Sequence, residues 1–205
     1  MAKLKSNTDP EPLVISRLKV VAALKTCGNE AAVNNLDYSK AIDLYAYDTN
    51  HGYTEWEDQL PVNYIKAFHL MNTPQKEVVL LPLDNCIVKD AHLITGGITD
   101  CAFMTNDELL FVEFKTNATS TSKRALKGNS RKACKQLWHT YESILKPKFA
   151  AQGIDLGNEV EVEFYIVFDS ALNVTAARAS FMNQMTNFQN VHNHLLFFAN
   201  ERVVE

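Results

Sequence analysis

The chain has 205 residues, of which 46% are hydrophobic and 21% charged, and its formal net charge is −4. It contains no long uncharged apolar stretch, which argues against a transmembrane helix, and its first residues lack the apolar core of a secretory signal. Its four cysteines form no CxxC pair. We therefore expect a reduced cytoplasmic protein that does not contact membranes, rather than a disulfide framework or a zinc site.

The basic residues are concentrated in one part of the chain. Between Lys115 and Lys148 there are nine basic residues and one acidic residue, Glu142, so this segment has a charge of +8 while the rest of the chain is acidic. A local basic patch on an acidic body suggests a polyanion site better than the overall charge does. A solvated basic helix face is the alternative explanation.

The first part of the chain is expected to be helical. The pattern predicts a helix over residues 12–26, which Gly28 would end. Helices are also predicted over residues 39–47 and 61–71. Residues 1–75 would therefore form a mainly helical region packed on a core made of residues 76–205, within one compact domain.

The second part of the chain alternates predicted strands and helices. A strand over 77–83 precedes an apolar hairpin over 98–116 and a polar loop over 117–128. The remaining predicted elements are a helix over 130–145 with Asn129 or Ser130 as its N-cap, a strand over 159–169, a helix over 174–190 and a strand over 195–200. This order predicts an α/β sandwich with a central mixed sheet.

The hairpin has a predictable register. Asn106 and Asp107 suit a two-residue turn, because both residue types tolerate positive φ. With that turn, Asp100 lies directly opposite Glu113. Alternation along the strands then puts Asp100, Glu113 and Lys115 on one face. Both faces are otherwise apolar, so we expect the hairpin to be central in its sheet, with helices on each side.

Two facing carboxylates need a shared proton or a cation, because like charges at this separation repel. Lys115 offers one positive charge on the same face. Mg²⁺ offers more, since it binds one or two carboxylates together with water and phosphate oxygens. The alternative is an internal salt bridge, in which Lys115 neutralises one carboxylate and the other reaches solvent.

These residues resemble the motif of the PD-(D/E)xK nuclease superfamily. Asp100 ends the segment "ITD", and Glu113 and Lys115 belong to "VEFK". The following segment "KACKQLWHTY" resembles the helix that carries a glutamine facing the active site, here Gln136. The chain departs from the pattern at Thr99, where the motif has proline, and at Tyr141, which follows Gln136 by five residues rather than four.

The resemblance implies a restriction-endonuclease-like α/β/α sandwich and a metal-dependent nuclease that hydrolyses phosphodiester bonds in DNA. Asp100, Glu113 and the Phe114 carbonyl would bind Mg²⁺, for which Mn²⁺ would substitute. Lys115 would polarise the attacking water, and Gln136 would border the site. Some members add an acidic residue from the first helix, for which this chain offers Glu30, Glu55 and Glu57.

The basic segment would then hold the phosphates that flank the scissile bond, without reading sequence. The residues expected to do so are Lys123, Arg124, Lys127, Arg131, Lys132 and Lys135. A homodimer is compatible with this function, as in many nucleases that cut both strands. The main alternative is a catalytically inactive member of the fold that binds nucleic acid or protein. A protein that binds an acidic small molecule through its basic loop is a third reading.

Overall fold

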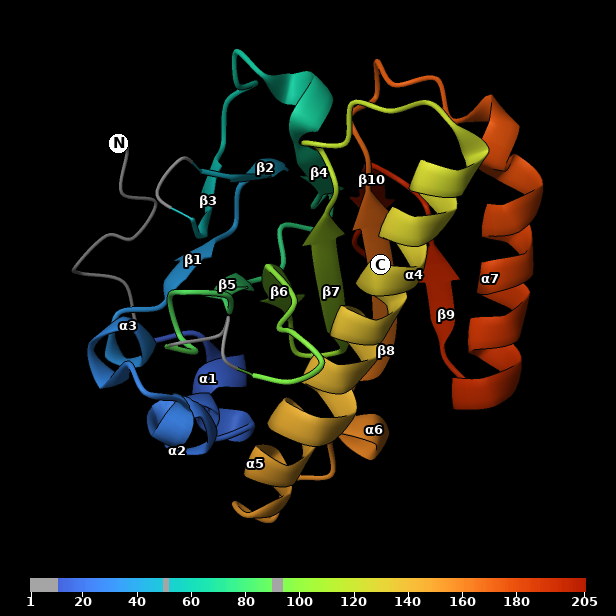
Figure 1. The fold of residues 1–205 in the computed structure, drawn as a ribbon. Helices are drawn as coiled ribbons and strands as arrows, with labels where there is room; N and C mark the ends of the chain where they lie inside the picture. Colours follow the sequence, from blue (N-terminus) through green and yellow to red (C-terminus); the bar gives the residue numbers. More distant parts are fainter. Residues whose placement is uncertain (1–10, 50–51, 90–93) are drawn as a thin grey trace.

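The computed structural model describes residues 11–49, 52–89 and 94–205, and Figure 1 shows its ribbon. The elements of the first half are α1 (Leu13–Arg17), α2 (Val20–Leu24), η1 (Lys25–Cys27), α3 (Glu30–Asn34), β1 (Asp37–Ser39), β2 (Asp43–Asp48), β3 (Thr54–Glu57), η2 (Tyr64–Lys66), β4 (Phe68–Met71) and β5 (Val78–Pro82). Those of the second half are β6 (Cys101–Met104), β7 (Glu108–Phe114), α4 (Lys123–His139), the π-helical segment η4 (Thr140–Leu145), α5 (Lys146–Ala150), α6 (Leu156–Glu159), β8 (Glu161–Val167), η5 (Thr175–Ala177), α7 (Arg178–His192), β9 (Leu195–Phe197) and β10 (Glu201–Val203).

The larger sheet has six strands in the order β1-β5-β6-β7-β8-β9. Strands β1, β5, β6 and β7 pair antiparallel, whereas β7, β8 and β9 pair parallel. Parallel neighbours need a crossover, which α4 supplies between β7 and β8 and α7 supplies between β8 and β9. The predicted mixed sheet is therefore confirmed.

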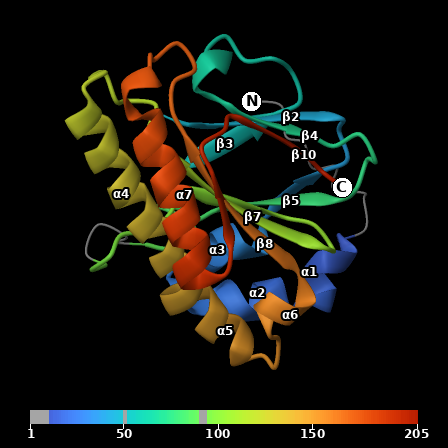
Figure 2. The same cartoon turned by 90° about the vertical axis from the view of Figure 1, so that its right-hand side faces the viewer.

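A second sheet of four strands, in the order β10-β4-β2-β3, covers one face of the larger sheet. Figure 2 shows it above the larger sheet, with α1, α2, α3 and α5 below. Two separate hydrophobic cores result, because successive side chains of each central strand point to opposite faces. Ala102 and Phe111 belong to the core under the helices, and Phe103 and Val112 to the core under the second sheet. The expectation of helices on both faces is wrong, because a sheet covers the second face.

The predicted helices over residues 39–47 and 61–71 are wrong. Strand β2 occupies the end of the first segment, and the second contains only the short 3-10 helix η2 before strand β4. In β2, Leu44 and Ala46 are buried while their neighbours are not, and Phe68 and Leu70 alternate in the same way in β4. This period of two buries one face of each strand against the larger sheet. The single helix over 12–26 is also divided, since Lys19 has a left-handed backbone (φ 52°) between α1 and α2.

Helix α4 begins earlier than the pattern indicates. Ser122 is its N-cap, and the Ser122 hydroxyl oxygen accepts a hydrogen bond from the Ala125 N–H. Neither Asn129 nor Ser130 is the cap, because both lie inside the helix. Part of the predicted polar loop is therefore helical, and α4 continues through η4 into α5.

The register of the β6–β7 hairpin agrees with the prediction. Cys101 pairs with Val112 and Met104 with Leu109, and the Thr105 N–H donates to the Glu108 carbonyl at the turn over 2.9 Å.

In the three described ranges, no helix has both the length and the apolar composition needed for crossing a bilayer. The four cysteines are free thiols.

Candidate functional site

The paired part of the hairpin ends immediately before the two acidic residues. Cys101 and Val112 form the last pair, and Asp100 and Glu113 occupy the next position. The Asp100 N–H donates to Glu113 Oε2 over 3.3 Å. The Phe114 N–H donates to Asp100 Oδ2 over 2.5 Å. The two side chains therefore lie together and are held by the backbone of the opposite strand.

The ladder between β6 and β7 opens at this point because Thr99 turns to a different partner. The register would place Thr99 opposite Phe114, but the Thr99 N–H donates to Thr140 Oγ1 over 2.8 Å. The N–H and C=O of one strand residue point to the same side. The Phe114 carbonyl therefore points toward the opened edge, beside Asp100, and does not receive the Thr99 N–H.

Lys115 joins the acid pair to helix α4. Its ammonium group pairs with Glu113 Oε1 and donates to Gln136 Oε1 over 3.2 Å. The Gln136 Nε2 donates in turn to the Ile98 carbonyl over 3.1 Å. Gln136 therefore fixes Lys115 on one side and the segment leading to Asp100 on the other. The structure thus brings together all four residues that the resemblance assigned to catalysis.

A glycine turn lets the segment that leads to Asp100 approach α4 closely. Gly96 and Gly97 both have left-handed backbones, with φ of 106° and 75°. A Cβ at Gly97 would lie 2.9 Å from Gln136 Cγ, and one at Gly96 would lie 2.7 Å from His139 Cγ. The Gly97 carbonyl also lies 2.9 Å from His139 Nδ1. Any larger residue at Gly97 would push Gln136 away from Lys115.

Both carboxyl groups are harder to ionise than usual. Burial raises the pKa of Asp100 well above its ordinary value, and the Glu113 carboxylate adds to this rise. Burial also raises the pKa of Glu113, to about 7, although the ion pair with Lys115 opposes the change. The Glu113 side chain is 1% exposed and that of Lys115 is 16% exposed. Asp100 and Glu113 are therefore more stable when they bind a proton or a cation than when both are ionised without one.

Two further acidic residues, neither of which was predicted to belong to the site, lie within electrostatic range of Asp100 and Glu113. The negative charge of Asp48, at the end of β2, raises the pKa of Asp100, and Asp84 raises that of Glu113. Desolvation raises the pKa of Asp48 itself, and the charge of Lys115 opposes this rise. The alternation of Leu44 and Ala46 was the signal for strand β2. Nothing in the sequence could place its end beside Lys115.

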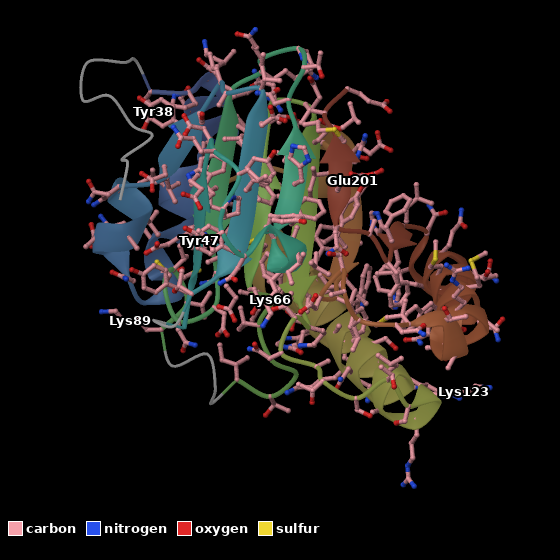
Figure 3. All side chains as sticks on the ribbon, turned by 90° about the horizontal axis from the view of Figure 1, so that it is seen from above. Tyr38, Tyr47, Lys66, Lys89, Lys123 and Glu201 are labelled. Atoms are coloured by element: carbon pink, nitrogen blue, oxygen red, sulfur yellow. The ribbon has the colours of Figure 1, made fainter. Side chains whose placement is uncertain are left out.

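Asp48, whose charge acts on Asp100, lines a cavity of about 370 Å³. Thr116 and Asn117, which follow Lys115, line it from the other side. Tyr47 and Lys66, which also line it, are labelled in Figure 3. The cavity therefore gives a ligand room beside the carboxyl end of β7. Three residues were candidates for an additional acidic residue of the site. Glu57 lines this cavity, and Glu55 precedes Glu57 by two residues in β3. Glu30 pairs with Lys25 at α3.

The donor set fits Mg²⁺ bound partly by water. Among the residues that the structure describes, no three His, Cys, Asp or Glu side chains gather to hold a metal by themselves. Asp100 and Glu113 offer two carboxylates, and the Phe114 carbonyl offers a third oxygen at the opened edge. Mg²⁺ commonly takes one or two carboxylates and completes its octahedron with water and phosphate oxygens. A structural zinc site, in contrast, needs four protein ligands.

The six basic residues predicted to bind nucleic acid all lie on α4. Lys132 lies one turn before Gln136 and so shares its side. Lys127, Arg131 and Lys135 instead line a groove between α4 and α7. Lys123 lies at the projecting end of α4 (Figure 3), where Arg124 follows it. The cations therefore spread over the side of α4 that faces away from the core rather than gather at the acid pair.

Tyr141, which follows Gln136 by five residues instead of the four of the family pattern, belongs to the core. Its side chain is 1% exposed and packs against Phe111 and Phe164. It therefore stabilises the contact between the helix and the sheet and does not reach the acid pair.

Comparison of the chain with protein-family models, with curated proteins and with solved structures found no match.

Proposed function

We propose that this protein is a metal-dependent nuclease that hydrolyses phosphodiester bonds in DNA. One observation carries the proposal: Asp100 and Glu113 are held together where the sheet ladder opens, and Lys115 connects Glu113 to Gln136. The order of β5, β6, β7, α4 and β8 supports assignment to the restriction-endonuclease-like fold. In this protein the second sheet would replace one helical layer of that fold.

The residues have separable roles in the proposed reaction. Asp100, Glu113 and the Phe114 carbonyl would hold Mg²⁺, or Mn²⁺ in its place. The bound ion would activate water and stabilise negative charge on the phosphate. Lys115 would place a fixed positive charge where negative charge develops on the reacting phosphate. Gln136 would hold the Lys115 ammonium group in that position.

The test is cleavage of labelled single-stranded and double-stranded DNA by the purified protein with Mg²⁺ or Mn²⁺. We expect cleavage that EDTA abolishes and that Lys115→Gln or Glu113→Gln lowers about 100- to 1,000-fold. Glu161→Gln, which changes an exposed acid at the start of β8, is the matched control and should cleave as wild type does. Cleavage by Lys115→Gln at the wild-type rate would refute the role given to Lys115.

The alternative function is binding of nucleic acid or protein by a catalytically inactive member of the same fold. It predicts no cleavage of any of these substrates or of RNA. It also predicts no Mn²⁺ between Asp100 and Glu113 in a crystal soaked with that ion. The intact set of Asp100, Glu113, Lys115 and Gln136 favours the enzyme, because these are the four residues to which the resemblance gives a catalytic role and they contact one another.

A further inference from the structure

A groove of about 940 Å³ runs between α4 and α7, two helices that lie side by side in Figures 1 and 2. Its α4 wall presents Lys127, Arg131 and Lys135, and its α7 wall presents Asn183 and Asn187. This groove is separate from the acid pair, because α4 lies between them. Nothing in the proposed cleavage chemistry uses it.

The groove has an unneutralised positive charge. Among the described residues that line it, none is acidic, and Lys127, Arg131 and Lys135 form no salt bridge within the described parts of the chain. Basic residues elsewhere do have acidic partners: Lys146 pairs with Glu142, and Arg202 with Glu108. Three unpaired cations in one groove of an acidic chain attract a polyanion.

The opposite wall offers groups that bind nucleic-acid bases. Asn183 and Asn187 are exposed on α7, and an amide both donates and accepts hydrogen bonds, which matches the edges of bases. Trp138 and His192, whose rings stack with centroids 3.9 Å apart, add an aromatic surface to the groove. The α4 wall therefore carries the cations and the Trp138 ring, and the α7 wall carries the amides and the His192 ring. Together these groups match the phosphates and bases of a nucleic-acid strand.

The two helices touch beneath the groove, which limits what can enter. The Gln184 Nε2 donates to Ser130 Oγ over 2.8 Å, and Trp138 packs against Phe188 with ring centroids 6.1 Å apart. A DNA duplex is wider than its major groove alone, which is about 12 Å across, so it cannot fit between helices whose axes lie about 8–10 Å apart. A single strand can lie along the groove above these contacts.

The glycine turn connects the groove to the acid pair. Gly96 lines the groove, while the adjacent Gly97 lies against Gln136, which binds Lys115. A strand that passes from Lys115 to the groove must cross α4, whose diameter with side chains is about 10–12 Å. At the stacked spacing of about 3.4 Å this distance corresponds to about three nucleotides.

We infer that the groove between α4 and α7 binds a single-stranded segment of nucleic acid, with its phosphates on Lys127, Arg131 and Lys135 and its bases against Asn183 and Asn187. The description of this segment as part of a substrate rests on the proposed function. Binding in the groove does not require cleavage.

The test is binding of a labelled oligothymidylate, an oligouridylate and a DNA duplex of equal length in EDTA. The triple variant Lys127→Gln/Arg131→Gln/Lys135→Gln should bind both single strands at least about tenfold more weakly than wild type. Its plot of log affinity against log salt should be less steep by about 2, because three phosphate contacts are lost. The two single strands also show whether the groove prefers DNA or RNA.

The matched control is Lys25→Gln/Lys40→Gln/Lys89→Gln, which removes the same charge outside the groove. It should bind single strands within about twofold of wild type and keep the salt dependence. Figure 3 labels Lys89 on the side of the molecule away from α4. Equal losses in the two triple variants would mean that net charge, and not the groove, binds the strand, and would overturn the inference.

A second pair of variants tests the α7 wall without changing α4. Asn183→Asp/Asn187→Asp places two negative charges in the groove, and Gln189→Glu/Asn190→Asp places the same charges at exposed positions of α7 that do not line it. Only the first should lose single-strand binding. The inference fails if both variants bind equally, if duplex binding depends on the groove as strongly as single-strand binding does, or if wild type binds no strand.

These outcomes separate the inference from the proposed function. Groove variants that lose single-strand binding, in a protein that cleaves nothing, would support the inference and refute the nuclease. Cleavage of DNA by a protein whose groove variants bind single strands as wild type does would support the nuclease and refute the inference.

Discussion

Asp100, which immediately precedes β6, lies beside Glu113 of β7, and the Asp100 N–H donates to Glu113 Oε2 over 3.3 Å. Because the Glu113 carboxylate raises the pKa of Asp100, the site is sensitive to protons as well as to cations. Lys115 is the cation that the protein itself supplies, and it pairs with Glu113. The site therefore allows tests that require neither a substrate nor a metal.

The first test concerns the ionisation of Glu113. Burial raises its pKa to about 7, and Lys115 limits the rise. Lys115→Gln removes that opposing charge, so the pKa of Glu113 should be higher than in wild type. Carboxyl ¹³C chemical shifts followed through a pH titration in EDTA measure both values. An unchanged pKa would mean that Lys115 does not interact with Glu113 in solution.

The stability of the metal-free protein should depend on pH through Glu113. Its pKa is about 7 when folded and near the ordinary 4.5 when unfolded, so the folded state binds this proton more tightly. The contribution of Glu113 to the free energy of unfolding is therefore fully present below pH 4.5 and is lost as pH rises through 7. Glu113→Gln cannot ionise, so its stability relative to wild type should increase over this interval.

Urea unfolding in EDTA at several pH values measures this difference. Glu161→Gln, which alters an exposed carboxylate at the start of β8, is the matched control. A Glu113→Gln curve parallel to that of wild type would show that Glu113 ionises as readily in the folded protein as in the unfolded chain.

Gln136 should position Lys115 rather than take part in the reaction. Gln136→Leu removes the hydrogen bonds to Lys115 and to the Ile98 carbonyl. A hydrogen bond to a charged group contributes about 1.5–3 kcal/mol, so kcat should fall about 10- to 100-fold while KM changes little. Gln136→Glu, which still accepts from Lys115, should retain more activity than Gln136→Leu. The control Gln189→Leu, at an exposed position of α7, should leave both constants unchanged.

Thr140 should stabilise the opened ladder. Its Oγ1 accepts the buried Thr99 N–H over 2.8 Å. Thr140→Val leaves that N–H without its acceptor, which should lower the free energy of unfolding by about 1–3 kcal/mol. The control Thr186→Val, on the exposed side of α7, should change it by less than about 0.5 kcal/mol. Chemical denaturation measures both effects, and equal effects would show that the Thr99–Thr140 contact does not stabilise the fold.

A second buried charge cluster should contribute to stability and not to cleavage. Arg202 pairs with Glu108 and Glu163 at 3.0 and 2.9 Å, and the Tyr165 hydroxyl donates to Glu163 over 2.6 Å. Arg202→Met leaves two buried carboxyl groups unpaired, so the protein should lose about 3–5 kcal/mol of stability. The exposed Arg178→Met is the matched control. A kcat below the wild-type value in folded Arg202→Met protein would contradict the purely structural role.

The sequence was most informative where contacts are local. A two-residue turn at Asn106 and Asp107 determines the pairing of the hairpin, so the facing positions of Asp100 and Glu113 were predictable before the fold was known. Gln136 could be assigned by resemblance because it lies on the first helix after the hairpin, where the family pattern has its glutamine. The interactions that complete the site, from Asp48 and Thr140, were not predictable in this way.

The failures occurred where a strand depends on a distant partner. Residues 43–48 form a strand because they pair with β3 and β4, and β4 also pairs with β10 at the end of the chain. Intrinsic preferences do not identify such a partner. The start of α4 was misplaced because the basic and polar residues 123–129 resemble a loop, although Ser122 provides an N-cap for them.

The hairpin origin of the acid pair also affects how the chain folds. Asp100 and Glu113 meet as soon as β6 and β7 pair, because the contact spans few residues. Gln136, and the second sheet that seals the other face, join through contacts across longer segments. Repulsion between two ionised carboxylates would therefore act early, before Gln136 has docked against Lys115. We therefore expect the rate of folding, and not only the stability of the folded protein, to depend on pH.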